Sequence, residues 1–141
     1  MAPGGCIFCQ IAAGSAPAAP VAEDDRALAF LDIFPVSEGH TLVIPKAHAE
    51  NIFEIDDASM RAVAAMARRV ARALHAEFEP DGMAVYQANG QAAGQTVWHY
   101  HVHLMPRRSG EAMQFHGRAR ADDGRLAEIA AALARRLERS D

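Results

Sequence analysis

The amino-acid sequence predicts an α+β fold, in which an antiparallel sheet carries one long central helix and a C-terminal helix. Short apolar and β-branched runs bounded by turns predict the strands, and two segments with helical spacing of apolar residues predict the helices. The chain has 141 residues, of which 50% are hydrophobic and 23% are charged. This size and composition suit one globular domain with its own core, so we expect residues 1–141 to form a single domain.

Two strands are expected early in the chain. Small residues and prolines at 13–20 form a linker. The run Arg26–Asp32 follows it and predicts a short buried strand. The β-branched and apolar residues of 40–45 predict a second strand, which Pro45 ends because proline has no N–H to donate to a sheet.

Two helices are expected where apolar residues recur at three- and four-residue steps. The clearer one extends from Ser59 to about Phe78, with arginines on the side opposite the apolar residues. Asp56, Asp57 and Ser59 are candidates for its N-terminal cap. The segment Asp123–Arg139 shows the same spacing and predicts the C-terminal helix.

The chain between these helices predicts two further strands. A turn at 80–82 leads into a strand at Met83–Gln87. The glycine-bearing loop Asn89–Gly94 then leads into a long strand, Thr96–Met105, which Pro106 ends. There are no internal repeats, and this order of elements favours an antiparallel sheet over a doubly wound one.

Net charge and hydropathy limit the partners that we expect. The formal net charge is −4, and the basic residues are dispersed apart from Arg107-Arg108 and the arginines near the C-terminus, so we expect no nucleic-acid partner. No apolar run approaches the roughly 20 residues of a membrane helix, so we expect no membrane partner. The N-terminus lacks the basic start of a signal peptide, and we expect a cytoplasmic protein.

Three histidines alternate with apolar residues in the predicted long strand. In a strand, His99, His101 and His103 lie on one face at steps of about 6.5–7 Å. A neutral imidazole is a good nucleophile for phosphorus, and its neighbours can donate to phosphate oxygens or to the leaving group. Two alternatives stay open: a solvated row of histidines, and a catalytic zinc bound by two histidines two residues apart.

Cys6 and Cys9 form a Cys-x-x-Cys pair near the N-terminus. In a reducing compartment this spacing indicates metal binding or redox chemistry. A redox pair of the thioredoxin kind should follow a strand, and no strand pattern precedes Cys6, so we favour a metal. The spacing alone does not choose between the two.

Several ordered motifs resemble those of the histidine triad (HIT) superfamily. The histidine pattern is followed by Leu-Met-Pro-Arg and preceded by Gly-Gln-Thr-Val at 94–97, and the resemblance extends to Cys-Ile-Phe-Cys at 6–9, AFLDI at 29–33 and GHTLVIPK at 39–46. It covers about residues 5–108 and leaves a C-terminal extension, 109–141, that contains the predicted helix. The resemblance implies the HIT fold, with a five-stranded antiparallel sheet.

The resemblance also implies roles for individual residues. His101 would attack the α-phosphate and carry the nucleotidyl group, His103 would contact the phosphate, and His40 would support the site. The implied nucleotide-binding residues are Gln95 and Thr96 at phosphate oxygens, the Gly94 backbone beside them, Asp32 at the ribose hydroxyls, and Phe8, Ile11, Phe30 and Ile33 around the base. Some relatives have an amide where this chain has Ala88, and Asn89 is a candidate to replace it. For Asp32 the alternative is a turn residue at a strand end, and for the apolar residues it is ordinary core.

Relatives with the same cysteine pair bind zinc through positions that match Cys6, Cys9, His48 and His99. Two thiols and two imidazoles are the ligand set of a closed tetrahedral zinc site. Such a zinc would be structural, and it would tie the N-terminal segment to the strand that presents His101.

The resemblance finally implies a function. We expect hydrolysis or nucleotidyl transfer at the α-phosphate of nucleoside phosphoramidates or dinucleoside polyphosphates, with magnesium accompanying a polyphosphate substrate. We expect a homodimer whose two sheets join into one. The alternatives are a non-catalytic nucleotide-binding regulatory protein and a zinc-dependent hydrolase that uses the triad as metal ligands. The two remaining histidines, His75 and His116, are expected to be solvated.

Overall fold

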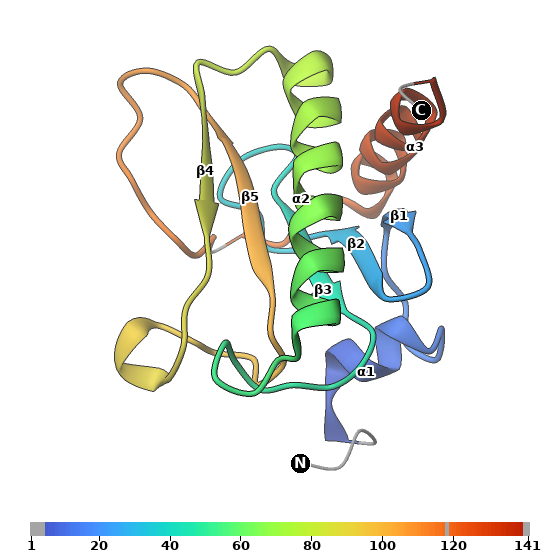
Figure 1. Ribbon diagram of the computed structural model, residues 1–141. Helices are drawn as coiled ribbons and strands as arrows, with labels where there is room; N and C mark the ends of the chain where they lie inside the picture. Colours follow the sequence, from blue (N-terminus) through green and yellow to red (C-terminus); the bar gives the residue numbers. More distant parts are fainter. Residues whose placement is uncertain (1–4, 118, 140–141) are drawn as a thin grey trace.

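The computed structural model describes residues 5–117 and 119–139, which fold around one antiparallel sheet (Figure 1). The strand order is β1-β2-β3-β5-β4, and every neighbouring pair is antiparallel. The predicted α+β class and the five-stranded sheet that the family resemblance implied are therefore confirmed, although the sequence pattern alone did not indicate β1. The strands are β1 (Pro20–Glu23), β2 (Ala27–Leu31), β3 (Thr41–Pro45), β4 (Gly82–Tyr86) and β5 (Val102–Arg107).

Two helices cover one face of the sheet. The central helix α2 (Asp57–Phe78) packs along β2, β3 and β5, and α3 (Asp123–Arg139) packs beside it on β1 and β2 (Figure 1). Their apolar sides form one core with the inward residues of the sheet, including Val43 and Leu104, which are both fully buried. Both helices match the sequence prediction. None of the described helices is both long enough and apolar enough to cross a bilayer.

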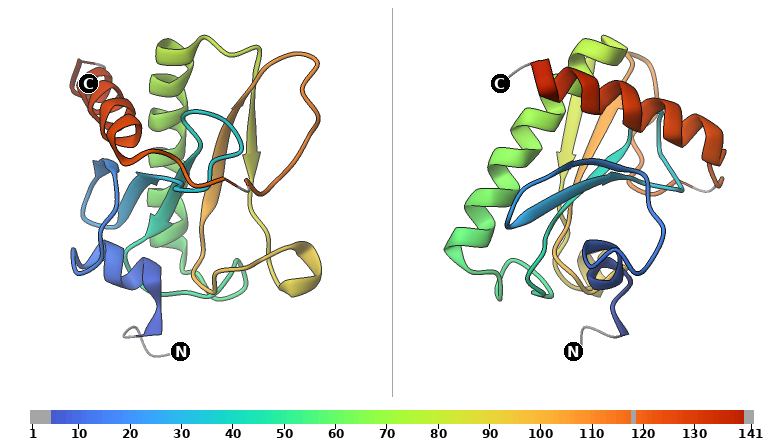
Figure 2. Two further views of the ribbon diagram at one scale, coloured as in Figure 1. Left: turned by 180° about the vertical axis from the view of Figure 1, so that it is seen from behind. Right: turned by 90° about the vertical axis from the view of Figure 1, so that its right-hand side faces the viewer.

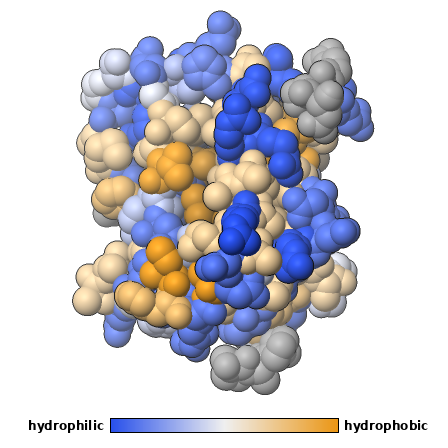
Figure 3. Space-filling model, in the orientation of Figure 1, coloured by the Kyte–Doolittle hydropathy of each residue, from blue (hydrophilic) through white to orange (hydrophobic). Residues whose placement is uncertain are grey.

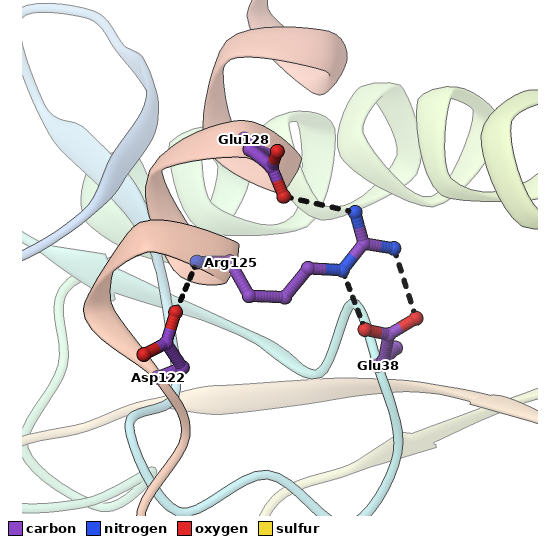
Figure 4. Close-up of polar contacts among 4 residues, drawn as sticks. All are labelled: Glu38, Asp122, Arg125 and Glu128. Atoms are coloured by element: carbon purple, nitrogen blue, oxygen red, sulfur yellow. Dashed lines mark hydrogen bonds and ion pairs between the residues drawn. The ribbon is translucent and has the colours of Figure 1, made fainter.

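Side-chain caps fix where these two helices begin. The carboxylate of Asp56 accepts from the backbone N–H of Ser59 at 2.7 Å, as predicted for one of the three candidates. Asp122 accepts in the same way from the N–H of Arg125 at 3.0 Å (Figure 4). The Arg125 side chain also binds both carboxylate oxygens of Glu38, at 2.6 and 3.0 Å, so α3 is tied to the loop between β2 and β3.

The other face of the sheet carries the short helix α1 (Ile7–Ala12), which the hydrophobic pattern did not predict. Phe8 from this helix packs against Phe30 of β2 in a second, smaller core. Figure 2, right, shows α1 and α2 on opposite sides of the sheet. Because both faces are covered, β2 and β3 are buried along their whole length.

The predicted strand Thr96–Met105 is wrong at both ends. Residues 91–93 form a 3-10 turn, η2 (Gln91–Ala93), and the chain stays irregular up to His101. At the other end β5 continues through Pro106 to Arg107. The carbonyl of Pro106 accepts from the hydroxyl of Ser37 on the side that faces β3. Because β3 begins only at Thr41, opposite Leu104, no strand there needs the missing proline N–H.

The predicted alternation survives this change. Tyr100, Val102 and Leu104 are all buried in the core under α2. Of the three histidines only His103 is within β5, and the other two precede it. The three rings are therefore on the sheet face opposite α2, as expected, although they do not belong to one regular strand.

Candidate active site

Eight of the predicted site residues line a pocket of about 580 Å³ on the sheet face opposite α2 and α3. This volume is within the range of small-molecule sites, roughly 300–1,000 Å³. Its walls come from α1, β2, the loop after β2, the segment before β5 and the chain beyond β5. The predicted residues that line it are Phe8, Ile11, Phe30, Asp32, Ile33, Thr96, His101 and His103.

His101 presents one unprotonated ring nitrogen in this pocket. Its Nδ1 lies 2.7 Å from the carbonyl oxygen of His99, and because a carbonyl can only accept, Nδ1 carries the proton and donates it. Nε2 therefore keeps its lone pair. Burial lowers the pKa of the ring, although the bond to the His99 carbonyl acts in the opposite direction. The ring is thus neutral at neutral pH, as a nucleophile must be.

His103 is oriented by a chain of two hydrogen bonds. The backbone N–H of Val36 donates to His40 Nδ1 at 3.0 Å, so the proton of the His40 ring is on Nε2. Nε2 lies 2.9 Å from His103 Nδ1 and donates to it. His103 therefore carries its own proton on Nε2 and lines the pocket as a donor. Burial is the main reason that the pKa falls to about 4 for His40 and about 3 for His103.

Asp32 is positioned at the pocket wall just after β2. One carboxylate oxygen accepts from the N–H of Phe34 at 2.9 Å, and the other lies 3.6 Å from His40 Nε2. Burial raises the pKa of Asp32, and the bond from Phe34 and the nearby His116 partly offset this rise. The carboxylate lines the pocket and can accept further hydrogen bonds, as the ribose-binding prediction requires.

Apolar side chains form the buried end of the pocket. The rings of Phe8 and Phe30 meet edge to face with centroids 5.4 Å apart. Phe8 also contacts the His101 ring in the same way, at 5.1 Å. Ile11 and Ile33 continue this wall toward the surface. A flat apolar slot of this kind suits a nucleobase.

Two predicted nucleotide-binding residues are engaged inside the loop before β5. The amide nitrogen of Gln95 donates to the carbonyls of Glu50 and Val97, and its oxygen accepts from the N–H of Gly90. Asn89 accepts from the N–H of Ile52 at 2.8 Å. Neither lines the pocket. In this structure both side chains hold the loop in shape, and their contacts with a nucleotide stay a prediction.

Gly94 lies in the same loop, with a φ of 98° that favours glycine. A Cβ atom at this position would come within 3.0 Å of the hydroxyl oxygen of Tyr86 and within 3.8 Å of His116 Nε2. The predicted close approach of a phosphate to this backbone is not tested by these contacts. Thr96, two residues later, does line the pocket.

Cys6, Cys9, His48 and His99 form a compact cluster beside the pocket. Each offers one ligand atom, and these atoms all lie within 4.8 Å of one another. The His48 and His99 Nδ1 atoms are 3.3 Å apart, and three sulfur–nitrogen distances are 3.3–3.5 Å. Ligands at zinc bonding distances on a tetrahedron are about 3.3–3.8 Å apart, so the cluster has the dimensions of a zinc site.

The protonation states in this cluster also suit a metal. The other nitrogen of His99, Nε2, lies 2.8 Å from the carbonyl oxygen of Pro45 and donates to it, so Nδ1 is unprotonated and faces the sulfurs. Burial lowers the pKa of His99 to about 4, and the ring is neutral. Burial, with the neighbouring Cys6, raises the pKa of Cys9 to about 11. A bound cation would favour the thiolate.

A second group, Asp32, His40 and His103, also brings possible ligand atoms together. His40 Nε2 and His103 Nδ1 are only 2.9 Å apart, and the former carries a proton. Two nitrogen ligands of one zinc ion are about 3.3 Å apart, and neither can be protonated. His40 and His103 are therefore joined by a hydrogen bond, with the Asp32 carboxylate beside them.

The prediction that His116 is simply solvated is incomplete. The side chain is exposed, as expected, but it lines the pocket together with Gly117. His116 lies outside the motifs that carry the family resemblance, and no spacing pattern relates it to the triad. His75 is exposed on α2, as predicted.

A domain family and several known proteins are similar to this chain. The HIT domain model matches residues 13–110. The chain is 45% identical to "Protein hit" of Bacillus subtilis over 139 residues, 96% of each chain. It is 42% identical over 106 residues to adenosine 5'-monophosphoramidase hnt1 of Schizosaccharomyces pombe, covering 75% of this chain and 77% of that protein.

Solved structures show the same architecture. A zinc-bound histidine triad family protein from Mycobacterium smegmatis has a TM-score of 0.86 and 38% identity, with 99% of this chain and 98% of that chain covered. A Hit-like protein from Bartonella henselae has a TM-score of 0.88 and 33% identity, with 94% and 96% covered.

Proposed function

The chain belongs to the HIT domain family, and on this basis we propose that it is a nucleotide hydrolase or nucleotidyl transferase that acts at the α-phosphate of nucleoside phosphoramidates or dinucleoside polyphosphates. The observation that carries the proposal is the neutral His101 ring, whose Nε2 lone pair is available in the pocket while Nδ1 is held by a backbone carbonyl. The name of the fission-yeast relative, a monophosphoramidase, supports the substrate class.

The reaction divides into two displacements at phosphorus. In the first, the Nε2 lone pair of His101 forms a P–N bond to the α-phosphorus, and the leaving group departs with the electron pair of the bond that breaks. The positive charge that develops on the ring is stabilised by the Nδ1–H bond to the His99 carbonyl. In the second, water or another acceptor attacks the phosphorus and gives up a proton, and the electron pair of the P–N bond returns to His101 Nε2.

Nearby groups stabilise the phosphate and hold the nucleoside. The Nε2–H of His103, fixed by His40, can donate to a non-bridging phosphate oxygen as negative charge develops on it. Thr96 offers a hydroxyl on the same wall. The base would enter the slot beside Phe8, and the ribose hydroxyls would donate to Asp32.

We also propose that Cys6, Cys9, His48 and His99 bind a structural zinc ion. The distances and protonation states of the cluster support this, as does the zinc-bound relative from Mycobacterium smegmatis. When bound, zinc would cross-link the N-terminal segment to His99, and the carbonyl of His99 in turn orients the nucleophile. Neither described ligand cluster has the oxygen-rich set that magnesium prefers, so magnesium would arrive with a polyphosphate substrate.

We propose that the protein is a homodimer. An apolar groove of about 330 Å³ lies between α2 and the strands β4 and β5, and Val85 beside it is 64% exposed. Figure 3 shows apolar atoms gathered over this region of the α2 face. The outer edge of β4 pairs with no other described strand, so a second copy could extend the sheet there. The cytoplasmic location and the lack of a nucleic-acid partner stay predictions.

The proposal is tested with a panel of adenosine and guanosine phosphoramidates and dinucleoside polyphosphates. The wild type should turn over members of the panel, and His101→Ala should lose at least about 10³-fold in kcat/KM while still binding the nucleoside monophosphate. Mass spectrometry of the quenched wild type should find a nucleotidyl group on the peptide that contains residues 99–103. The exposed His75→Ala is the matched control and should behave like the wild type.

Each rival function gives a different result in the same experiment. A non-catalytic regulatory protein would bind the monophosphate and turn over none of the panel. A zinc hydrolase would lose turnover at once on chelation and would form no adduct on the peptide. Either result would refute the proposal.

A further inference from the structure

The chain beyond β5 crosses the open side of the pocket before it enters α3. Figure 2, left, shows this segment passing over the sheet on the face opposite α2. Arg107 holds its start by donating to the carbonyl of Ala112 at 2.6 Å. At its far end the N–H of Ala121 donates to the carbonyl of Ile33 at 2.8 Å. The pair formed by Arg125 and Glu38 then fixes α3 to the loop after β2 (Figure 4).

Two residues that flank His116 anchor the middle of this segment to β4 and to the loop after β2. The Phe115 ring stacks on Tyr86 of β4, with centroids 4.4 Å apart and an angle of 28° between the planes. Gly117 packs against the backbone of the loop after β2, where a Cβ atom would clash with the carbonyl oxygens of Phe34 and Pro35. Residue 116 is therefore held between two fixed points, directly over the pocket.

The His116 ring is directed toward the catalytic histidines. Its centroid lies 6.4 Å from the centroid of the His103 ring, and the two ring planes meet at 87°. The centroids of the His103 and His101 rings are 5.0 Å apart. His116 lines the pocket with both rings but stays exposed to solvent. It therefore occupies the open edge of the pocket, away from the apolar slot at the buried end.

The position of His116 coincides with the side of the pocket from which the leaving group should depart. The nucleoside is expected in the buried slot, and the group that leaves the phosphorus must depart on the side from which product can escape to solvent. The other pocket histidines already have their protons assigned: His101 donates to a carbonyl, and His103 accepts from His40 and has one N–H for the phosphate. Neither holds a further proton for the leaving group.

We propose that His116 is a catalytic residue that protonates the amine leaving group of a phosphoramidate substrate. This inference depends on the proposed function. As His101 Nε2 forms its bond to phosphorus, the P–N bond of the substrate breaks, its electron pair stays on the amine nitrogen, and that nitrogen takes a proton from the His116 imidazolium. In the second displacement, neutral His116 accepts a proton from the attacking water, which restores the starting state.

An amine requires this proton, whereas a nitrophenolate does not. The test therefore compares two derivatives of adenosine monophosphate in single-turnover experiments. One is a phosphoramidate that releases an alkylamine, and the other is an aryl ester that releases p-nitrophenol. His116→Ala should slow release of the amine by about 100-fold or more, the usual contribution of a general acid, and should change release of p-nitrophenol by less than about threefold. Once His116→Ala has released p-nitrophenol, attack by water should be slower than in the wild type, so the nucleotidyl adduct on residues 99–103 should accumulate.

His116→Gln separates proton transfer from hydrogen bonding, because glutamine can donate a hydrogen bond but cannot give up the proton. If His116 is the acid, His116→Gln should be as slow as His116→Ala with the amine substrate, and His75→Ala should match the wild type. Equal effects on both leaving groups, rescue by glutamine, or no effect on either would overturn the assignment. A wild type that releases neither leaving group would instead refute the proposed function, and the assignment with it.

Discussion

Lowering the pH from 7 to 5 should destabilise the folded protein through two buried imidazoles, those of His40 and His103. Burial holds their pKa values at about 4 and about 3, whereas a histidine of the unfolded chain titrates near 6.5. Below pH 6.5 the unfolded chain therefore binds protons that the folded chain does not. Stability is lost as the pH falls from about 6.5 toward these folded values, and it is regained as the pH rises.

The size of this effect at pH 5 depends little on the folded pKa values, because both rings are still neutral at that pH. The unfolded state gains about 1.9 kcal/mol for each ring between pH 7 and pH 5, from the proton that each one takes up. The two rings together should lower the free energy of unfolding by about 4 kcal/mol. For an m-value of about 2 kcal/mol/M, this moves the urea midpoint down by about 2 M.

Urea unfolding of the wild type and of His103→Gln at the two pH values isolates the contribution of one ring. The metal cluster also titrates, but it is present in both proteins, so its effect cancels in the difference between them. The pH-dependent loss should be about 1.9 kcal/mol smaller in His103→Gln, while His75→Gln, which changes an exposed ring, should retain the full loss. Equal losses in the wild type and in His103→Gln would show that the ring is not held neutral by burial.

Three further outcomes are expected. Gly117→Ala should displace the segment that carries His116 and lower kcat/KM for the amine substrate by about 10-fold, with a smaller effect on release of p-nitrophenol, as stopped-flow kinetics would reveal. Phe8→Leu should weaken binding of adenosine monophosphate by about 10-fold in calorimetry, because a flat ring beside the base is lost; unchanged affinity would remove Phe8 from the base slot. Cys6→Ser should reduce the bound zinc measured by elemental analysis and lower the melting temperature, and a chelator should then have little further effect; equal zinc content in variant and wild type would exclude this cluster.

The sequence predicted best those elements whose own residues decide their structure. The continuous apolar run from Ala27 to Leu31 and the periodic apolar stripe of α2 can both be recognised in the sequence, and the structure has both elements. The six residues of α1 are too few for a helical period to appear. The start of β5 depends on where β3 stops pairing, which is a tertiary property that the local sequence does not record.

The residues of the candidate site also divide into those that the local sequence indicates and those whose place depends on remote contacts. The motif carried the positions of His101 and His103, because alternation alone puts them on the face away from the core. The motif could not show that the Gln95 side chain is hydrogen-bonded to three backbone groups, because one of them, the carbonyl of Glu50, is 45 residues away in the sequence. His116 was missed for a related reason: its place over the pocket is set by the contacts of Phe115 and Gly117 with remote elements.

Alternation also cannot say which nitrogen of each ring carries the proton, and this decides the chemistry of the triad. The carbonyl of Pro45 accepts from His99 Nε2, which fixes the ring proton there and leaves Nδ1 for the cysteine cluster. The carbonyl of His99 accepts from Nδ1 of His101, which fixes the proton there and leaves Nε2 for phosphorus. His103 has no such carbonyl and takes its tautomer from His40. Three identical side chains at equal spacing thus become a metal ligand, a nucleophile and a hydrogen-bond donor, because each ring meets a different partner behind it.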